Sequence, residues 1–499
     1  MKDKVLCWFD GFPLQFGIVN ELQKIYDSEF YAIIDINKGK EFYEKQSLIE
    51  FTNQWFYRDY IKNTSNFDIN YLSNFEKKYG IDLWKIAYSD PILYKHNKYY
   101  QFNHNQILST LEQECKFFEL VLNEVNPNFL ILRITDSGNT QILQQMCRSK
   151  GIKILTLGFP RFGFRANISE ELDTLDYETN LYDKKYNSKN WDELRNYLQG
   201  YAIQDKILKD NYRVSKKNRF DASLEFLKLL LDPTYTNFYR NYGRNFYNSI
   251  FVELKSIIQT NSRKHFVNKK FIRKINSDEK FVYFPLHLEP ERTLLVSAPY
   301  YTNQIELIKN IAKSIPIDFL LYVKEHPRQG SEGWRDIEDY NEILNLPNVR
   351  LLHPEVSNDI LLEKCSGVLT INGTLGLESI FNEKPTIIFA DSIYSNISAV
   401  SRITNLEHLP KIIKQTIDKN IELEELNDFT KKIENNSFIF NIQQLESKTH
   451  NLFYHGGYLF DVKIDENKVK KFLNDEKESF QTLAKEHVKK IQQHKKNLK

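Results

Sequence analysis

A chain of 499 residues with 41% hydrophobic and 27% charged residues is typical of a globular protein with more than one domain. The 68 basic residues nearly balance the 66 acidic ones, so no overall field attracts nucleic acid and a nucleotide would have to bind at a local site. The four cysteines form no CxxC pair, which favours buried thiols over a zinc site or disulfides. The sequence has neither a membrane-spanning stretch nor the apolar run of a signal peptide, so we expect a cytoplasmic protein.

The first third of the chain alternates short apolar runs with segments of helical spacing. The runs at 5–9, 30–34, 129–134 and 152–157 predict strands, and the segments 16–25, 107–125 and 140–149 predict helices. This alternation is typical of a parallel α/β sheet. Residues 38–105 are aromatic and polar without β periodicity, so helices and loops are expected there.

A second α/β series begins near Lys280 and has the clearest pattern. Strands are predicted at 281–284, 319–323, 349–352, 367–371 and 386–389, and helices at 302–314, 358–364 and 374–382. Ser357 is the expected N-cap of the helix that begins at Asn358.

These patterns divide the chain into four parts. We expect a Rossmann-like domain at 1–167, a mainly helical insertion or linker at 168–276, a second Rossmann-like domain at 277–420, and a helical tail at 421–499 whose last third is rich in lysine. In open α/β sheets the ligand binds beyond the carboxyl ends of the strands. A ligand shared by two such domains would therefore lie in the cleft between them.

Three polar loops each follow a predicted strand of the second series. They contain His287, Glu289 and Glu291, then Lys324, His326 and Pro327, and then Asn372, Gly373, Thr374 and Glu378. Any one of them could be an ordinary surface loop or a capped helix. If the strands are parallel, however, all three loops lie on the same rim of the sheet.

The residue types in these loops suit a phosphorylated ligand. An imidazole at position 326 can donate a hydrogen bond to phosphate, and Lys324 adds charge. Gly373 lets the backbone approach closely, and Thr374 is expected to cap a helix whose amino end favours an anion. The Glu378 carboxylate can accept hydrogen bonds from a ribose or sugar diol.

The order PLHLEPE, VKEHP and TINGTLGLESIFNEKPTIIF resembles the bacterial capsule polysaccharide biosynthesis proteins, a family that includes Kdo transferases. The resemblance covers about 110 residues well, 281–390, and extends weakly to 129–157. It implies a GT-B fold, in which two Rossmann-like domains face a cleft, with the acceptor on the first domain and the nucleotide-sugar on the second. A His-Pro pair and a later Ser/Thr-bearing loop also occur in CMP-sugar-dependent GT-B enzymes. By that resemblance His326 and Thr374 contact the phosphate of a donor, which is expected to be a CMP-sugar, and Glu378 lies near its nucleoside.

The first domain departs from the family pattern. Kdo-transferring members have a Glu-Asp-Gly-Phe segment whose Asp is a candidate base, whereas residues 157–165 here contain no carboxylate. Asp136 and Asp10, which follow predicted strands, are the substitute candidates, with loop caps as the alternative reading. Arg161 and Arg165 could hold an anionic acceptor or donor carboxylate, or could be surface charge. The absence of a DxD pair in a loop favours transfer without a metal or other cofactor.

The sequence therefore predicts a glycosyltransferase of bacterial surface polysaccharide assembly that transfers a sugar from a nucleotide-activated donor to a saccharide or lipid-linked acceptor. The alternatives are a nucleotide-sugar epimerase, a polyol-phosphate transferase, or a non-catalytic homologue that binds glycan or acts as a scaffold. The lysine-rich tail could contact an anionic membrane surface, although a solvated helix is the simpler interpretation.

Overall fold

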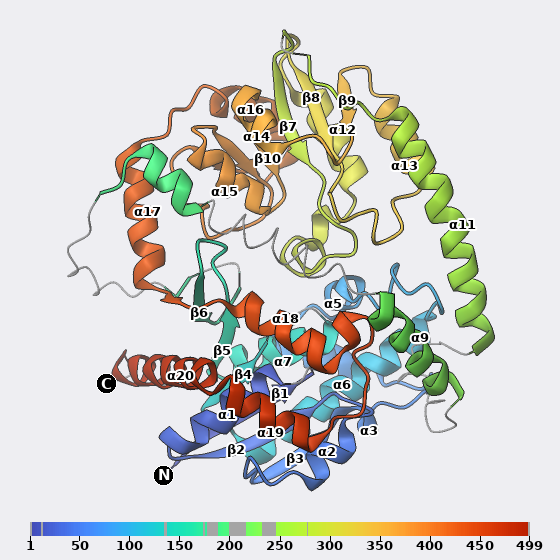
Figure 1. Cartoon of the computed structure of the whole chain (residues 1–499), viewed down its shortest axis with the longest axis vertical. Helices are drawn as coiled ribbons and strands as arrows, with labels where there is room; N and C mark the ends of the chain where they lie inside the picture. Colours follow the sequence, from blue (N-terminus) through green and yellow to red (C-terminus); the bar gives the residue numbers. More distant parts are fainter. Residues whose placement is uncertain are drawn as a thin grey trace.

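The computed structural model describes residues 2–10, 13–133, 137–172, 175–176, 188–198, 216–231, 246–276 and 278–497. These residues form two α/β halves, one above the other in Figure 1, and each half is built around its own sheet. The N-terminal half is drawn in blue and cyan, and the second half in yellow and orange.

The first half contains a seven-stranded sheet with the order β13-β6-β5-β4-β1-β2-β3. Its strands are β1 (Asp3–Phe9), β2 (Ser28–Ile34), β3 (Asn53–Phe56), β4 (Phe129–Leu132), β5 (Lys153–Gly158), β6 (Arg165–Ser169) and β13 (Phe438–Ile439). The strands β3, β2, β1, β4 and β5 run parallel, as expected, whereas β6 and β13 are antiparallel additions at one edge. The expectation that residues 38–105 contain no strand is wrong, because β3 pairs with β2.

Both faces of this sheet are buried, which explains why its strands appear as continuous apolar runs. In β1, Val5, Cys7 and Phe9 belong to one core cluster, and Leu6 and Trp8 belong to the other. The helices of this half are α1 (Leu14–Ile25), α2 (Lys40–Lys45), α3 (Tyr57–Tyr60), α4 (Ile69–Tyr79), α5 (Leu83–Ser89), α6 (His104–Val125) and α7 (Gly138–Ser149).

The second half contains a six-stranded sheet with the order β12-β11-β10-β7-β8-β9, and all of its pairs are parallel. The strands are β7 (Phe281–Pro285), β8 (Leu320–Lys324), β9 (Val349–Leu352), β10 (Val368–Thr370), β11 (Thr386–Ile388) and β12 (Val400–Arg402). The helical segments are η2 (Thr293–Ser297), η3 (Pro299–Tyr301), α12 (Gln304–Ser314), α13 (Ile337–Leu344), α14 (Asn358–Lys364), α15 (Thr374–Phe381), η4 (Leu406–His408) and α16 (Leu409–Thr416). Ser357 caps α14 as predicted, because its hydroxyl accepts the N–H of Asp359 at 3.2 Å.

The C-terminal tail returns to the first half: its first helix, α17, lies beside the second half, and α18, α19 and α20 lie against the N-terminal elements in Figure 1. The tail contains α17 (Leu423–Asn435), α18 (Ile442–Phe453), η5 (His455–Gly457), α19 (Glu466–Asp475) and α20 (Lys477–Asn497). Apolar side chains of α18, α19 and α20 join the core cluster of β1 and α1. The tail is not helical throughout, since it supplies the edge strand β13.

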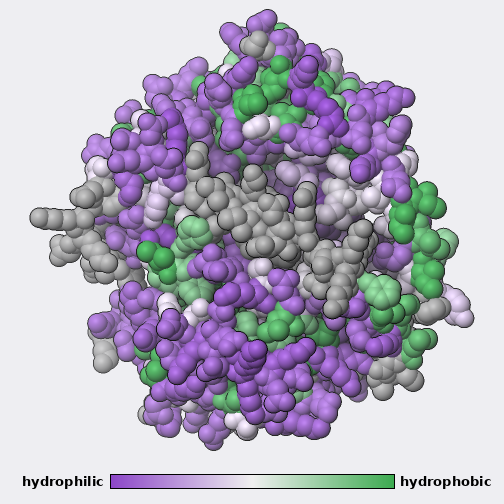
Figure 2. Space-filling model, in the orientation of Figure 1, coloured by the Kyte–Doolittle hydropathy of each residue, from purple (hydrophilic) through white to green (hydrophobic). Residues whose placement is uncertain are grey.

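Two helices on the side of the molecule, α9 (Lys216–Leu231) and α11 (Phe246–Lys270), expose apolar side chains. They form the green region along the right edge of Figure 2, and the exposed apolar residues of these helices include Phe220, Leu224, Leu227, Leu231, Phe251, Leu254 and Ile258. In the described part of the chain, no helix is long and apolar enough to cross a membrane. The four cysteines are buried and free, as predicted. Two Rossmann-like halves of this topology confirm the GT-B-like fold class.

Candidate functional site

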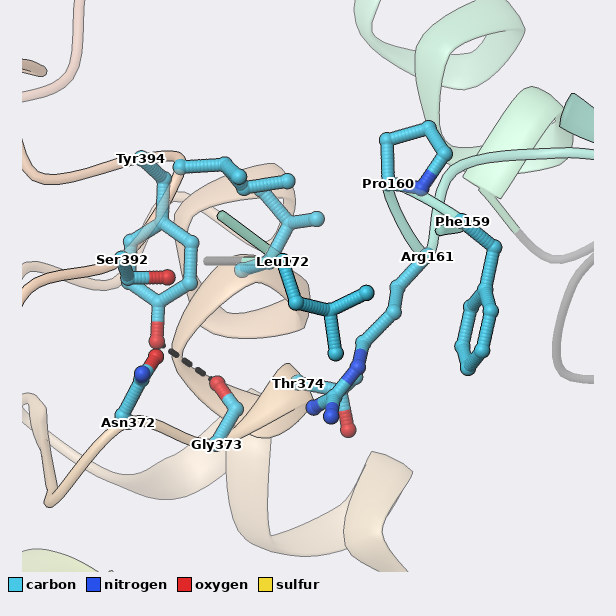
Figure 3. Close-up of a pocket in the computed structure, with 11 residues that line it drawn as sticks. Phe159, Pro160, Arg161, Leu172, Asn372, Gly373, Thr374, Ser392 and Tyr394 are labelled. Atoms are coloured by element: carbon cyan, nitrogen blue, oxygen red, sulfur yellow. Dashed lines mark hydrogen bonds between the residues drawn. The ribbon is translucent and has the colours of Figure 1, made fainter. Parts of the chain in front are cut away.

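Two adjoining cavities lie between the halves at the carboxyl ends of strands. The first, of about 390 Å³, is lined by the loop after β5 and by the loops after β10 and β11 (Figure 3). The second, of about 580 Å³, extends between α14, α15 and the segment around Arg195. Arg161, Thr374 and Leu377 line both cavities. The packing of the two halves therefore brings together residues that are more than 200 positions apart, at the carboxyl ends of strands, where α/β folds bind ligands.

The amino end of α15 forms one wall of these cavities. Thr374 does not cap this helix as expected: Gly373 is the N-cap, and Thr374 is the first helical residue. The Gly373 N–H donates to Thr370 Oγ1 at 3.1 Å, and the Gly373 carbonyl accepts the Tyr394 hydroxyl at 2.6 Å. The first N–H groups of a helix have no partner within it, so this end of α15 can bind an anion.

Asn372, directly before this helix, lines the first cavity (Figure 3). Its side chain is only 5% exposed, and its Nδ2 has no hydrogen-bond partner in the described part of the chain. A buried amide without a partner costs free energy unless a water or a ligand accepts its hydrogen bond. Asn372 is therefore suited to bind an oxygen of a ligand in this cavity.

Arg161 reaches the same place from the first half, and Figure 3 shows its guanidinium pointing towards Thr374. The backbone of Arg161 is left-handed, with φ of 55°, which is unfavourable for a residue other than glycine. Such strain is often found where a side chain is held for function. Arg161 also contributes, together with His287 and His326, to a lowered pKa of Glu291, against the opposing effect of burial.

The two histidines predicted for the site lie at the carboxyl ends of neighbouring strands. His287 is buried, and its Nε2 lies 3.2 Å from Thr370 Oγ1, the atom that also accepts the Gly373 N–H. Its Nδ1 lies 3.8 Å from Glu291 Oε2. His326 Nδ1 accepts the Arg328 N–H at 3.2 Å, so a neutral ring carries its proton on Nε2. Pro327 lies in the turn that the Gln329 N–H closes on the His326 carbonyl at 3.0 Å.

Lys324 does not line the second cavity. It is 4% exposed, and its Nζ donates to Asn358 Oδ1 at 2.5 Å. Burial lowers its pKa to about 8, although the carboxylates of Glu378 and Asp359 act in the opposite direction. Both carboxylates line the cavity, so the buried cation balances part of their charge.

Glu289, predicted to bind the donor, is part of a buried ion-pair network instead. Its Oε1 lies 2.6 Å from Arg335 Nη1 and accepts the Gln304 side chain at 2.6 Å. The Nε of Arg335 donates to Glu325 Oε2 at 3.0 Å, and the Tyr340 hydroxyl donates to the same oxygen at 2.7 Å. This network joins the loops after β7 and β8, because Arg335 also donates to the His287 carbonyl and Glu325 also accepts the His326 N–H.

The candidates on the first half are less closely tied to the cavities. Asp136 lies outside the described residues, and Asp10 lines neither cavity; its Oδ1 accepts the Gln15 side chain at 3.5 Å. Arg165 also lies apart from them, because its guanidinium donates to the Ser437 hydroxyl at 2.7 Å and to two backbone carbonyls at 2.9 Å. Arg165 therefore connects β6 to the tail and is not placed to bind the anion predicted for it.

Several lining residues were missed by sequence reasoning, namely Leu172, Arg195, Asp359, Ser392 and Tyr394. They lie in loops and helices without a motif, and only the packing of the halves brings them to the cavities. Among the described residues, no group of three or more His, Cys, Asp or Glu side chains is placed to hold a metal ion.

Comparison with known proteins gives a family match for part of the chain. Residues 204–411 match the model of the family described as "Capsule polysaccharide biosynthesis protein", which confirms the resemblance seen in the motifs. No curated protein sequence matches the chain.

Similar solved structures include the UDP-GlcNAc 2-epimerase from Methanocaldococcus jannaschii, with 12% identity, coverage of 85% of this chain and 94% of that one, and a TM-score of 0.24. The UDP-GlcNAc 2-epimerase from Neisseria meningitidis has 14% identity, coverage of 89% and 99%, and a TM-score of 0.25. The beta Kdo 2,7 transferase KpsC from Thermosulfurimonas dismutans has 14% identity, coverage of 66% and 89%, and a TM-score of 0.31. Identities and TM-scores this low give no information about the ligand of this chain.

Proposed function

We propose that the protein is a GT-B-type glycosyltransferase of bacterial surface polysaccharide assembly, since residues 204–411 match the model of the capsule polysaccharide biosynthesis protein family. It transfers a sugar from a nucleotide-activated donor to a saccharide or lipid-linked acceptor. The observation that carries this proposal is the cavity at the amino end of α15, where Arg161 of one half and Asn372 of the other converge.

In this proposal the donor phosphate binds at the amino end of α15. The backbone N–H groups and the positive end of the helix dipole favour the phosphate, and Arg161 supplies a full charge from the opposite wall. These groups stabilise the charge that develops on the phosphate as its bond to the sugar breaks. His326, which was expected to contact the phosphate, lines neither cavity. Transfer then requires neither a metal ion nor another cofactor.

The carboxylates of the second cavity favour a CMP-sugar. Glu378 and Asp359 line this cavity next to Thr374. A carboxylate accepts hydrogen bonds from ribose hydroxyls, and it can also accept one from the exocyclic amino group of cytosine. Uracil presents a carbonyl oxygen at that position, which a carboxylate repels. We therefore expect CMP to bind more tightly than UMP or UDP.

A thermal-shift screen with CMP, CDP, UDP and GDP tests the proposed nucleotide site. CMP should raise the Tm most, because at equal concentration the nucleotide that binds most tightly stabilises the native state most. A ligand at roughly 100 times its Kd stabilises it by about 2.7 kcal/mol. No stabilisation by any of the four nucleotides would contradict the proposal and favour a non-catalytic scaffold. Stabilisation by UDP alone would contradict the choice of cytidine.

Incubation with a donor alone separates transfer from epimerisation. A transferase releases nucleotide slowly in the absence of an acceptor, whereas an epimerase converts the donor without one. A polyol-phosphate transferase would release CMP and leave a phosphate on its product. Mass spectrometry of the products distinguishes these three reactions.

The proposed place of action is the cytoplasm, with peripheral contact with the inner membrane. In the tail helix α20, Lys490 and Lys495 pair with Asp176 and Asp3. The attraction to an anionic membrane surface therefore comes from exposed lysines such as Lys485. Co-sedimentation with vesicles that contain anionic lipid, at low and high salt, tests this contact.

A further inference from the structure

A third cavity, of about 350 Å³, lies between the halves on the other side of the His287 loop. The first half contributes two tyrosines, a lysine and a histidine to it, and the second half contributes Thr302 and residues between Glu289 and Leu295. None of its lining residues lines either cavity of the proposed donor site.

The tyrosines form an exposed aromatic surface. Tyr88 and Tyr94 are 55% and 48% exposed, and their ring centroids are 4.5 Å apart. Large exposed aromatic rings that converge at a cavity commonly mark a binding site. A sugar ring has one face rich in C–H groups and hydroxyls around its edge, so it can pack on such rings while the hydroxyls reach polar neighbours.

This aromatic surface is held in place by a buried carboxylate. Asp90 lies between the two tyrosines in the sequence, and its Oδ1 accepts the backbone N–H groups of Ile92 and Leu93 at 2.7 and 3.1 Å. Its Oδ2 accepts the N–H of Gly138 at 2.7 Å, which fastens the loop to the start of α7. A surface fixed in this way loses little conformational entropy when a ligand binds.

Glu291 connects this cavity to the proposed donor site. It lines the cavity, and its Oε2 lies 3.8 Å from His287 Nδ1. The other ring nitrogen of His287 lies 3.2 Å from Thr370 Oγ1, which accepts the N–H of Gly373 at the start of α15. Hydrogen-bond distances thus link His287 to the amino end of α15, and Glu291 lies next to this histidine at a longer distance.

We propose that the cavity formed by Tyr88, Tyr94 and Glu291 binds the acceptor saccharide, and that Glu291 is the base that removes the proton from its attacking hydroxyl. This inference rests on the proposed transferase function. The acceptor oxygen forms a bond to the anomeric carbon of the donor, and its proton passes to the Glu291 carboxylate. The bond between the anomeric carbon and the phosphate oxygen breaks, and its electron pair stays on the departing nucleotide. His287 is a positioning residue that orients the carboxylate.

Saturation-transfer NMR with the full chain tests the saccharide site. The probes are the methyl glycosides of glucose, galactose and N-acetylglucosamine at millimolar concentration, each with CMP present. We expect transfer to the ring C–H protons of at least one glycoside, and a loss of at least about tenfold in affinity in the double variant Tyr88→Ala/Tyr94→Ala. Tyr458→Ala, which removes a ring that is 48% exposed elsewhere, is the matched control and should bind as the wild type does.

The outcomes separate this site from the proposed function. A CMP signal without any glycoside signal overturns the acceptor site and leaves the nucleotide site standing. Loss of the CMP signal as well defeats the proposed function itself. Equal glycoside binding by the wild type and the double tyrosine variant shows that the saccharide binds elsewhere.

Release of CMP from a panel of CMP-sugars, with the same glycosides as acceptors, tests the role of Glu291. Glu291→Gln should lower kcat by about 10²–10⁴-fold, the usual contribution of a general base, and should leave the Kd for CMP unchanged. Glu291→Asp should recover part of the rate. Turnover by Glu291→Gln within about twofold of the wild type overturns the assignment. If the wild type binds both CMP and a glycoside but transfers from no CMP-sugar, the assignment of a base is likewise overturned.

Discussion

The hydroxyl of Tyr394 donates a hydrogen bond to the carbonyl of Gly373 at 2.6 Å, so that the loop after β11 holds the amino end of α15. The same hydroxyl packs against Gly376, one turn into the helix, where a Cβ would come closer to it than real Cβ contacts do. The wall of the proposed phosphate site therefore depends on a glycine as well as on a tyrosine.

Gly376→Ala should destabilise the protein by about 1–3 kcal/mol, the usual cost of overpacking a close contact. In the Tyr394→Phe background the same change should cost less, because the oxygen that blocks the new methyl group is gone. Urea denaturation of both single variants and the double variant gives the coupling. If the changes in the free energy of unfolding of the two single variants simply add in the double variant, the cost of Gly376→Ala comes from the helix and not from contact with the Tyr394 hydroxyl.

Arg161→Ala should weaken CMP binding by about 10–100-fold, since a hydrogen bond to a charged group contributes roughly 1.5–3 kcal/mol. Arg165→Ala is the matched control, because this guanidinium binds Ser437 and the Glu434 carbonyl instead of lining the cavities. It should lower the Tm and leave the Kd for CMP unchanged. Isothermal titration calorimetry measures both affinities, and equal losses in the two variants would contradict the assignment of Arg161.

Arg335→Met should lower the free energy of unfolding by about 3–5 kcal/mol, because it leaves the buried carboxylate of Glu325 without its cation. Glu325 is 0% exposed, so water cannot replace the lost partner. The double variant Arg335→Met/Glu325→Gln should recover part of the loss. Arg350→Ala, which removes a partly exposed arginine 3.9 Å from Glu279, is the control and should change stability by less than about 1 kcal/mol.

Binding of CMP should weaken as the pH rises through about 8, the pKa to which burial lowers Lys324. Above this pH the side chain loses its charge and no longer balances Glu378 and Asp359, so the cavity becomes more negative. The phosphate itself does not titrate in this range, since its second pKa is about 6. Calorimetry at pH 7 and pH 9 should show the decrease in the wild type, and Lys324→Met should bind with the same affinity at both pH values.

The same lysine predicts the sign of a change in stability. Its pKa is lower in the folded protein than in the unfolded chain, where it is about 10.4, so between these values the unfolded state binds more protons. The contribution of Lys324 to the free energy of unfolding therefore rises as the pH increases from about 8 to about 10.4, and it is constant below that window. Chemical denaturation of the wild type and Lys324→Met across this range isolates the contribution.

Local pattern was sufficient to predict most of the second half. The apolar runs of β7, β8 and β10 and the polar residues that follow them indicated a parallel sheet with its ligand-binding rim at the carboxyl ends. Ser357 was recognisable as a cap because capping depends on neighbours in the sequence. The short strands β3, β6, β12 and β13 were missed, since short strands are defined by pairing with distant partners.

The sequence by itself determined the fold class, the family resemblance and the rim on which His287, His326 and Thr374 lie. Local periodicity indicates where strands and helices lie, and the residue types of each loop indicate its chemistry. Only the tertiary structure decided what each side chain does there. It assigned Glu289 to the Arg335 network and Arg165 to the tail, and it brought Arg161 to Thr374. The physical reason is that the partners of a charged side chain are set by the packing of elements hundreds of residues apart, which no window of sequence contains.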